Sequence, residues 1–210
     1  MIRPPSPAPS PGTGLVLQAL RAGGLGPYDL QVPAGHCAVI MGASGAGKSR
    51  LLRWIADLDP HDGLASLDGQ ARASMAATAW RRRVTYVAAE PAWWDESVRA
   101  HLRDPARAAA LLPALGLSPE LLDAPVARLS TGERQRLALA RSVHDEVRFL
   151  LLDEPSSALD PVNAARMEQA ILDLKAAGVG IVLVTHHAQQ ARRLGDACYR
   201  LDAHSLARSA

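Results

Sequence analysis

The chain has 210 residues, of which 48% are hydrophobic and 21% are charged, and its formal net charge is +2. This composition is typical of a globular protein with a core, and the length suits one domain or one domain with a small insert. A net charge this small implies no general attraction to nucleic acid or to an anionic membrane. No apolar stretch approaches the ~18 residues that a membrane-spanning helix needs, so any membrane role is expected to come through a partner.

The N-terminal stretch 1–14 is rich in proline and serine and lacks the apolar core of a signal peptide. It predicts a disordered leader on a cytoplasmic protein. Cys37 and Cys198 each lie in an apolar run typical of a strand. That setting favours small buried side chains over a disulfide or a metal site.

Apolar runs between glycine, proline and other turn residues predict the strands. They cover residues 15–20, 28–32, 37–41, 64–67, 84–87, 149–152, 181–185 and 197–201. Helices are predicted from Lys48 to near Asp57, from Ser130 onward, over 161–176 and 188–194, with short proline-broken helices between 97 and 122. The turns Asp62-Gly63 and Asp68-Gly69 bracket one short strand and predict an antiparallel side sheet.

A glycine-rich loop lies between the apolar strand 37–41 and the helix that follows it. The loop and helix start match GxxxxGK[ST], a phosphate-binding loop, through Gly42, Ala43, Ser44, Gly45, Ala46, Gly47, Lys48 and Ser49. Glycines let backbone N–H groups point inward, and the helix N-terminus adds its dipole to the same anion. We expect Lys48 to reach the β- and γ-phosphates and the Ser49 hydroxyl to bind Mg²⁺, so the chain is predicted to bind a nucleoside triphosphate.

Two acids, Asp153 and Glu154, end the apolar strand 149–152. We expect Asp153, on the strand beside the loop, to hold Mg²⁺ directly or through water, and Glu154 to be the base that polarises the attacking water. Adjacent strand residues point to opposite faces, so the chain must turn at Glu154 for both acids to serve one site. Acids that only cap the turn before Pro155 are the alternative.

His186 and His187 follow the strand 181–185. The carboxyl end of a parallel strand is the ligand-binding edge of such a sheet. We therefore expect His186 to contact the γ-phosphate and the hydrolytic water. His187 is expected to be a surface residue.

The alternation of apolar strands and helices predicts an α/β fold. We expect a P-loop NTPase core with a mainly parallel sheet covered on both faces, the antiparallel side sheet, and a small helical subdomain inserted over about 91–145.

Taken in order, these motifs resemble those of ATP-binding cassette (ABC) ATPases. The most specific is Leu129–Arg136, Leu-Ser-Thr-Gly-Glu-Arg-Gln-Arg, which is similar to the ABC signature but has Thr131 and Glu133 where glycine and glutamine are commonest. Ser130 and Glu133 also match a helix capping box. The resemblance covers about 15–201, so 15–205 is expected to be a single ABC ATPase domain followed by a tail, 206–210.

The resemblance implies a head-to-tail dimer, formed with a second copy or a related cassette, that holds two ATP molecules. Glu154 would be the catalytic base and His186 the γ-phosphate switch, while Ser130 and Gly132 would contact ATP across the interface, which Asp160 would bridge. It also implies a motor subunit on the inner face of the cell membrane, similar to compact exporter-type cassettes. The integral membrane subunit would dock at Trp93-Trp94, with at least one tryptophan exposed.

Three positions depart from the family pattern. Ala89 stands where the family has a glutamine that touches Mg²⁺ and water, and Glu90 or a water is expected to substitute. Arg50 replaces a common threonine after Ser49 and is expected to add positive charge near the α-phosphate. No aromatic residue stands at the adenine-stacking position, for which Arg21 or Tyr28 are candidates.

Two other functions stay open at this point. One is a soluble, non-transport ABC ATPase that acts on nucleic acid or a ribosome. Such proteins have a long coiled coil or two cassettes in one chain, and neither is present in this sequence, so no direct nucleic-acid contact is expected. The other is a degenerate cassette that binds ATP only structurally, which Ala89 would favour and Glu154 and His186 oppose.

Overall fold

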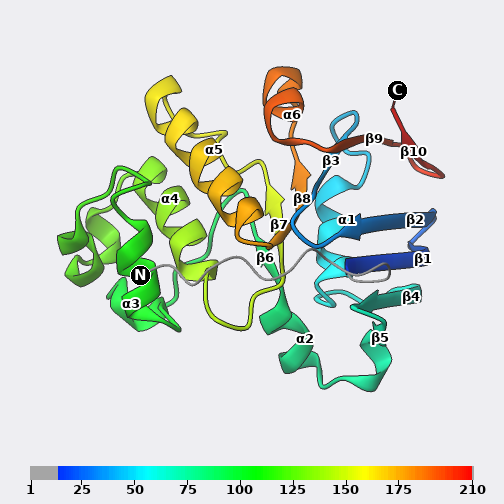
Figure 1. The fold of residues 1–210 in the computed structure, drawn as a ribbon, viewed down its shortest axis with the longest axis horizontal. Helices are drawn as coiled ribbons and strands as arrows, with labels where there is room; N and C mark the ends of the chain where they lie inside the picture. Colours follow the sequence, from blue (N-terminus) through cyan, green and yellow to red (C-terminus); the bar gives the residue numbers. More distant parts are fainter. Residues whose placement is uncertain (1–13, 210) are drawn as a thin grey trace.

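The computed structural model describes residues 14–209 and shows an α/β fold with two sheets (Figure 1). The predicted leader, apart from Gly14, lies outside the described residues. Gly14 itself begins the first strand, so the leader prediction was one residue too long.

The larger sheet has six strands in the order β10-β9-β3-β8-β7-β6. Its strands are β3 (Cys37–Met41), β6 (Val84–Val87), β7 (Phe149–Asp153), β8 (Gly180–Val184), β9 (Ala197–Leu201) and β10 (Leu206–Arg208). Pairing is parallel from β9 to β6, as predicted, and antiparallel between β9 and β10. The prediction of a tail over 206–210 was wrong for β10, because Asp202 accepts hydrogen bonds from the backbone of His204 and Ser205 and turns the chain back.

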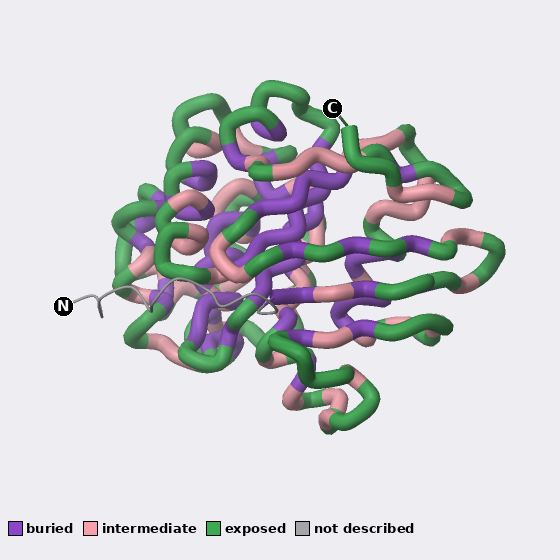
Figure 2. The backbone as a smooth tube through the Cα atoms, turned by 45° about the vertical axis from the view of Figure 1, so that its right-hand side comes forward, coloured by how far each residue is buried: buried purple, intermediate pink, exposed green. Residues whose placement is uncertain are grey.

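Both faces of this sheet are buried, which explains why its central strands are apolar throughout. On β7, Phe149 and Leu151 belong to one core cluster, whereas Leu150 and Leu152 belong to the other. The buried segments run through the centre of the molecule in Figure 2. One cluster lies against α4 (Thr131–Ser142), α5 (Pro161–Ala176) and α6 (Ala188–Leu194), and the other against α1 (Lys48–Ile55) and the smaller sheet.

The smaller sheet is antiparallel, as predicted, with the order β2-β1-β4-β5. Its strands are β1 (Gly14–Ala22), β2 (Leu25–Pro33), β4 (Asp62–Leu67) and β5 (Gln70–Ala71). The strand β5, the 3₁₀ turn η1 (Arg72–Ser74) and α2 (Ala77–Arg83) were not predicted. Tertiary contacts hold α2, since Trp80 is fully buried and its Nε1 donates to the Ile55 carbonyl over 2.8 Å.

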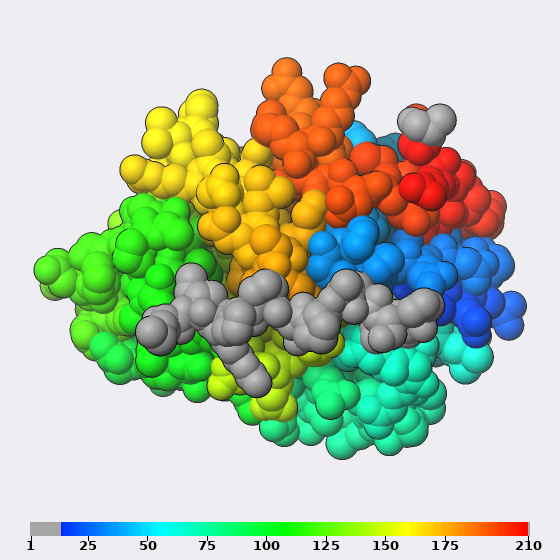
Figure 3. Space-filling model, viewed as in Figure 1, coloured from blue at the N-terminus to red at the C-terminus, as the bar shows by residue number. Residues whose placement is uncertain are grey.

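Short helices fill the stretch between β6 and α4, as the prolines predicted. They are η2 (Arg99–His101), α3 (Pro105–Leu111), η3 (Pro119–Asp123) and η4 (Val126–Arg128). In Figure 3 this helical part and the antiparallel sheet lie at opposite ends of the molecule. Within 14–209, no helix combines the length and the apolar character needed to cross a bilayer.

Candidate functional site

The glycine-rich loop connects β3 to α1. Gly45 has φ 78° and Gly47, the residue that caps α1, has φ 97°. These are left-handed conformations that a side chain would strain. Lys48 Nζ donates to the carbonyl oxygens of Gly42 and Ala43, 2.9 Å each, so the ammonium group lies against the loop. The local geometry is that of an anion-binding loop at a helix N-terminus.

Arg50 lies on the side of α1 that faces the smaller sheet. Its guanidinium carbon is 5.7 Å from the centre of the Trp54 ring. A Cβ atom built on Gly23, in the turn between β1 and β2, would come within 2.7 Å of the guanidinium. Arg50 therefore lies between α1 and this turn, and its role toward the α-phosphate stays a prediction.

The sheet order changes one expectation about the acids. The strand β7, which ends in Asp153, was expected beside the loop strand, but β8 lies between β3 and β7. The sequence could not fix this, because strand order depends on how each crossover returns to the sheet. As a result, the end of β8, which leads to His186, lies between the loop and the acids.

Glu154 is turned by the backbone, as the sequence required. Its φ is 47°, an unusual value for a residue other than glycine, and its N–H donates to the Val184 carbonyl over 3.0 Å. This turn brings Glu154 Oε2 to 2.9 Å from Nδ1 of His186. The Glu154 side chain is 19% exposed and the His186 side chain is 60% exposed, so solvent reaches the pair mainly at the histidine. His187 is exposed, as predicted.

Asp153 ends β7 and is only 4% exposed. Its Oδ2 accepts a hydrogen bond of 2.9 Å from the Tyr86 hydroxyl, on β6. Burial, and then the adjacent Asp153 carboxylate, raise the pKa of Tyr86 above its usual range, so the phenol stays protonated and donates. No sequence motif marks Tyr86 as a site residue, because only tertiary packing brings its hydroxyl to Asp153.

The donor set near the loop fits Mg²⁺. A serine hydroxyl and one carboxylate suffice, because Mg²⁺ is usually held by one or two protein oxygens together with phosphates and waters. In the described part of the chain, no group of three or more histidine, cysteine or acidic side chains is placed to hold a metal by itself. Ser49 and Asp153 stay the predicted residues that would hold the ion together with phosphate oxygens and waters.

The signature-like segment begins α4 with the predicted capping box. Ser130 Oγ accepts from the Glu133 N–H at 3.2 Å, and Glu133 Oε2 accepts from the Ser130 N–H and hydroxyl at 2.8 Å each. These hydrogen bonds lower the pKa of Glu133. Ser130 is exposed and Gly132 is half-buried, so the helix start is accessible to another molecule.

Asp160 caps α5. Its Oδ1 accepts from the backbone N–H groups of Val162 and Asn163, 2.9 Å each, and these bonds and the Asn163 side chain lower the pKa of Asp160. The sequence indicates this cap, because aspartate followed by proline is a common start of a helix. Asp160 is exposed, and its role across a dimer interface stays a prediction.

Tyr28 is not available to stack on adenine. It is fully buried, its hydroxyl donates to the carbonyls of Asp202 and Ala203 at 2.7 and 3.1 Å, and its ring packs against Trp54. The alternation that placed Tyr28 on a strand did not show which face was covered. Arg21 is exposed, with Nε 3.9 Å from an Asp62 oxygen, and its role stays a prediction.

The tryptophan pair lies in the loop after β6. Trp94 is 73% exposed, which confirms that at least one tryptophan faces solvent, and Trp93 is half-buried. His101 contacts both rings edge-on, and the Arg141 guanidinium lies 4.6 Å from the centre of Trp93 and 5.2 Å from that of Trp94. Among the described residues, Trp93 Nε1 is one of the few buried polar atoms without a hydrogen-bond partner. The loop thus presents an exposed aromatic side chain that contacts His101 and Arg141.

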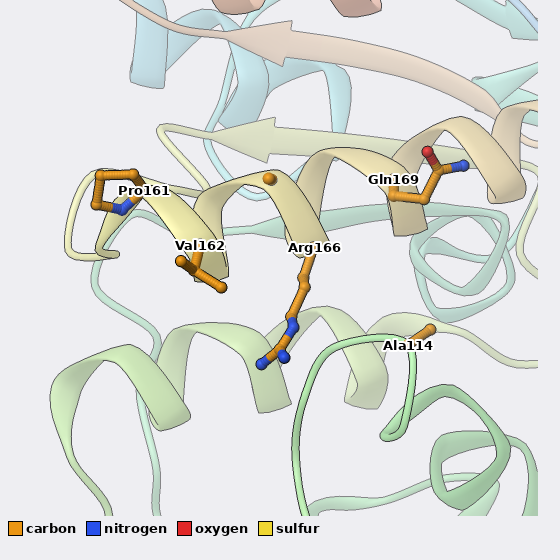
Figure 4. A pocket seen from close by; sticks show the side chains of 6 residues that line it. Ala114, Pro161, Val162, Arg166 and Gln169 are labelled. Atoms are coloured by element: carbon orange, nitrogen blue, oxygen red, sulfur yellow. The ribbon is translucent and has the colours of Figure 1, made fainter.

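A shallow groove of about 640 Å³ lies elsewhere, along the outer side of α5. Figure 4 shows Pro161, Val162, Arg166 and Gln169 on α5 and Ala114 on a neighbouring loop, with the Arg166 side chain extending away from α5 toward α4. None of the predicted site residues lines it, so the groove is separate from the phosphate loop.

The fold and the site together define a phosphate-loop nucleotide-binding protein. Residues 25–157 match the family described as ABC transporter. The chain belongs to this family and contains its ATP-binding cassette domain.

Several curated proteins are similar to this chain. "Protein STAR1" of rice is 38% identical over 180 residues, which cover 80% of this chain and 52% of STAR1. "Aliphatic sulfonates import ATP-binding protein SsuB 1" of Pseudomonas syringae pv. tomato is 38% identical over 192 residues, covering 90% of this chain and 69% of that protein. The chain thus spans about half to two thirds of the length of these relatives.

A solved structure of similar fold is a dimeric, post-hydrolysis state of the ATP-binding cassette MJ0796 bound to ADP and Pi. It superposes with a TM-score of 0.80 at 24% identity, covering 91% of this chain and 96% of the other. The likeness establishes the cassette fold.

Proposed function

We propose that this cassette hydrolyses ATP to ADP and phosphate and that the hydrolysis powers a membrane transporter. The observation that carries the proposal is the 2.9 Å contact between Glu154 and His186 at the carboxyl edge of the sheet that also carries the phosphate loop. An ATP-hydrolysing site needs a general base and a residue that orients it. A site that binds nucleotide only structurally needs neither.

In the proposed reaction, the Glu154 carboxylate accepts a proton from a water molecule whose oxygen attacks the γ-phosphorus. The bond from the γ-phosphorus to the β–γ bridging oxygen breaks, and ADP leaves with that electron pair. His186 donates through Nδ1 to Glu154 and keeps its carboxylate oriented. Its other ring nitrogen can donate to a γ-phosphate oxygen when the ring is doubly protonated. Bound Mg²⁺ would neutralise charge that develops on the phosphates.

The proposed assembly is an ATP-sandwich dimer with a second copy or a related cassette. Support comes from the exposed helix start at Ser130 and the exposed Asp160. The similar cassette MJ0796 is a dimer in its structure with ADP and Pi, which supports such an assembly.

The proposed membrane partner docks at the Trp93-Trp94 loop, which would place the cassette on the cytoplasmic face of the membrane. The names of several relatives describe import ATP-binding proteins. They lend no support to the expected likeness to compact exporter-type cassettes, which stays a prediction. The cargo would be selected by the membrane subunit.

Hydrolysis is tested by phosphate release from MgATP with the purified chain and with Glu154→Gln. The substitution keeps the shape of the side chain and removes the proton acceptor, so turnover should fall by about a hundredfold or more while ATP binding persists. The variant should also accumulate as a dimer in ATP. Parent-like turnover in Glu154→Gln would refute the assignment of the base.

A further inference from the structure

Gln135 is a buried amide that connects α4 to the segment after β7. It is 2% exposed. Its Nε2 donates to the Glu154 carbonyl over 2.9 Å and to Ser157 Oγ over 3.3 Å, while its Oε1 accepts from the Ala158 N–H over 3.3 Å. Both ends of the amide therefore bind one short segment, residues 154–158.

This segment needs to be held, because its backbone at Glu154 is in a disfavoured conformation. A residue other than glycine persists at φ 47° only where its surroundings enforce it. The Glu154 N–H is bound to Val184, and its carbonyl accepts from Gln135 and from the Ser157 N–H at 3.2 Å. Gln135 is the side chain that binds this carbonyl from outside the segment.

The direction of the Glu154 side chain follows from this backbone. A rotation of its peptide units would move the carboxylate away from Nδ1 of His186, which belongs to an exposed side chain. Gln135 also lies on the helix that starts at Ser130. A shift of that helix would therefore reach the Glu154 carbonyl directly.

We propose that Gln135 is a positioning residue that holds the backbone of Glu154 so that its carboxylate stays against His186. The expected effect on turnover rests on the proposed ATPase function. The effect on the Glu154–His186 contact does not.

The test compares Gln135→Met with Gln169→Met. Methionine has similar length and cannot form these hydrogen bonds. Gln169 lies on the exposed side of α5 and donates to Asp173 over 2.8 Å, so it controls for the loss of a glutamine amide (Figure 4). Measurements are kcat and KM for MgATP, the thermal midpoint, and the imidazole nitrogen NMR shifts of His186, assigned with His186→Gln.

We expect Gln135→Met to lower kcat about tenfold with KM within about twofold, the pattern of a lost positioning interaction. The His186 shifts should move toward those of a Glu154→Ala variant, and Gln169→Met should match the parent in both. A folded Gln135→Met with parent kcat and parent His186 shifts would overturn the proposal. A lower thermal midpoint with unchanged His186 shifts would also overturn the proposal, because Gln135 would then stabilise the fold without positioning Glu154. If the parent does not hydrolyse ATP, the proposed function fails and the NMR shifts alone decide on Gln135.

Discussion

Nδ1 of His186 lies 2.9 Å from Oε2 of Glu154. The two residues follow different strands, β7 and β8, whose first residues are 31 positions apart in the sequence. The contact exists because β7 and β8 are parallel neighbours, with Asp153 opposite Val184. Each strand ends at the same edge, and the left-handed turn at Glu154 brings its carboxylate back toward the residue that follows β8. The site is thus assembled by sheet register rather than by local sequence.

His186→Ala should reduce kcat for ATP about a hundredfold, because it removes the imidazole that lies 2.9 Å from the Glu154 carboxylate and that is proposed to contact the γ-phosphate. ATP affinity should change only a few-fold, since the loop and Lys48 remain. Steady-state phosphate release and nucleotide titration measure the two effects. His187→Ala is the matched control, because His187 is the adjacent exposed histidine and lacks the bond to Glu154. Equal losses in both variants would contradict a specific role for His186.

The capping box of α4 should make stability depend on pH. Its hydrogen bonds hold the Glu133 pKa below the ordinary value of 4.5, so the folded chain binds fewer protons than the unfolded chain between the two pKa values. The contribution is complete above the ordinary pKa and is lost as pH falls through the folded pKa. Glu133→Gln should therefore lower the free energy of unfolding by about 0.5–1 kcal/mol at neutral pH.

The difference between parent and Glu133→Gln should shrink as the solution is acidified below about pH 4. Urea unfolding of both proteins across this range measures it. A difference that stays constant with pH would show that the carboxylate charge does not stabilise the helix start.

Much of this fold is encoded in local pattern. The bounds of β3, β6, β9, α5 and α6 agree with those predicted from apolar runs, caps and prolines. The local pattern did not predict β5, β10 and α2. β10 and β5 are too short for a period to show, and α2 depends on burial of Trp80 under the Ile55 carbonyl.

The site divides in the same way. Motifs identified the loop, the acids and the switch histidine as candidates, because each carries its own spacing. The intervening position of β8, the burial of Tyr28 and the roles of Tyr86 and Gln135 depend on tertiary packing. Gln135 is a polar residue on a face of α4 that is otherwise largely apolar and buried. Its hydrogen-bond partners lie on another segment, so the sequence alone could not identify them.

Trp94→Ala should weaken binding of the proposed membrane partner. Trp94 is 73% exposed, His101 contacts its ring edge-on and the Arg141 guanidinium lies 5.2 Å from the ring centre, so a large aromatic side chain of the kind common at interface hot spots faces solvent. We expect a loss of about 2 kcal/mol, roughly thirtyfold in affinity. Pull-down titration with the membrane subunit of the transporter that this cassette is proposed to power measures it, with the thermal midpoint unchanged. Leu64→Ala, at another exposed apolar residue (64%), should bind as the parent does, and parent-like binding by Trp94→Ala would exclude this loop as the docking surface.

Ala89 should raise the Mg²⁺ requirement of hydrolysis. Val87 ends β6 and pairs with Leu152, the residue before Asp153 on β7. Ala89 follows two positions after Val87, in the loop that leaves the sheet beside Asp153. An alanine side chain there cannot accept a hydrogen bond or ligate the metal. A water or the exposed Glu90 carboxylate would then take the place of the missing glutamine, since Mg²⁺ readily keeps waters among its ligands.

Ala89→Gln should therefore lower the Mg²⁺ concentration for half-maximal activity, by about threefold for a gain near 0.6 kcal/mol, and should increase stimulation by the membrane partner. Glu90→Ala should raise that concentration, because it removes the substitute carboxylate. The measurement is ATPase rate against free Mg²⁺ at fixed ATP in the parent and both variants. Three superimposable curves would mean that residue 89 does not face the metal site and that the loop after β6 is not coupled to it.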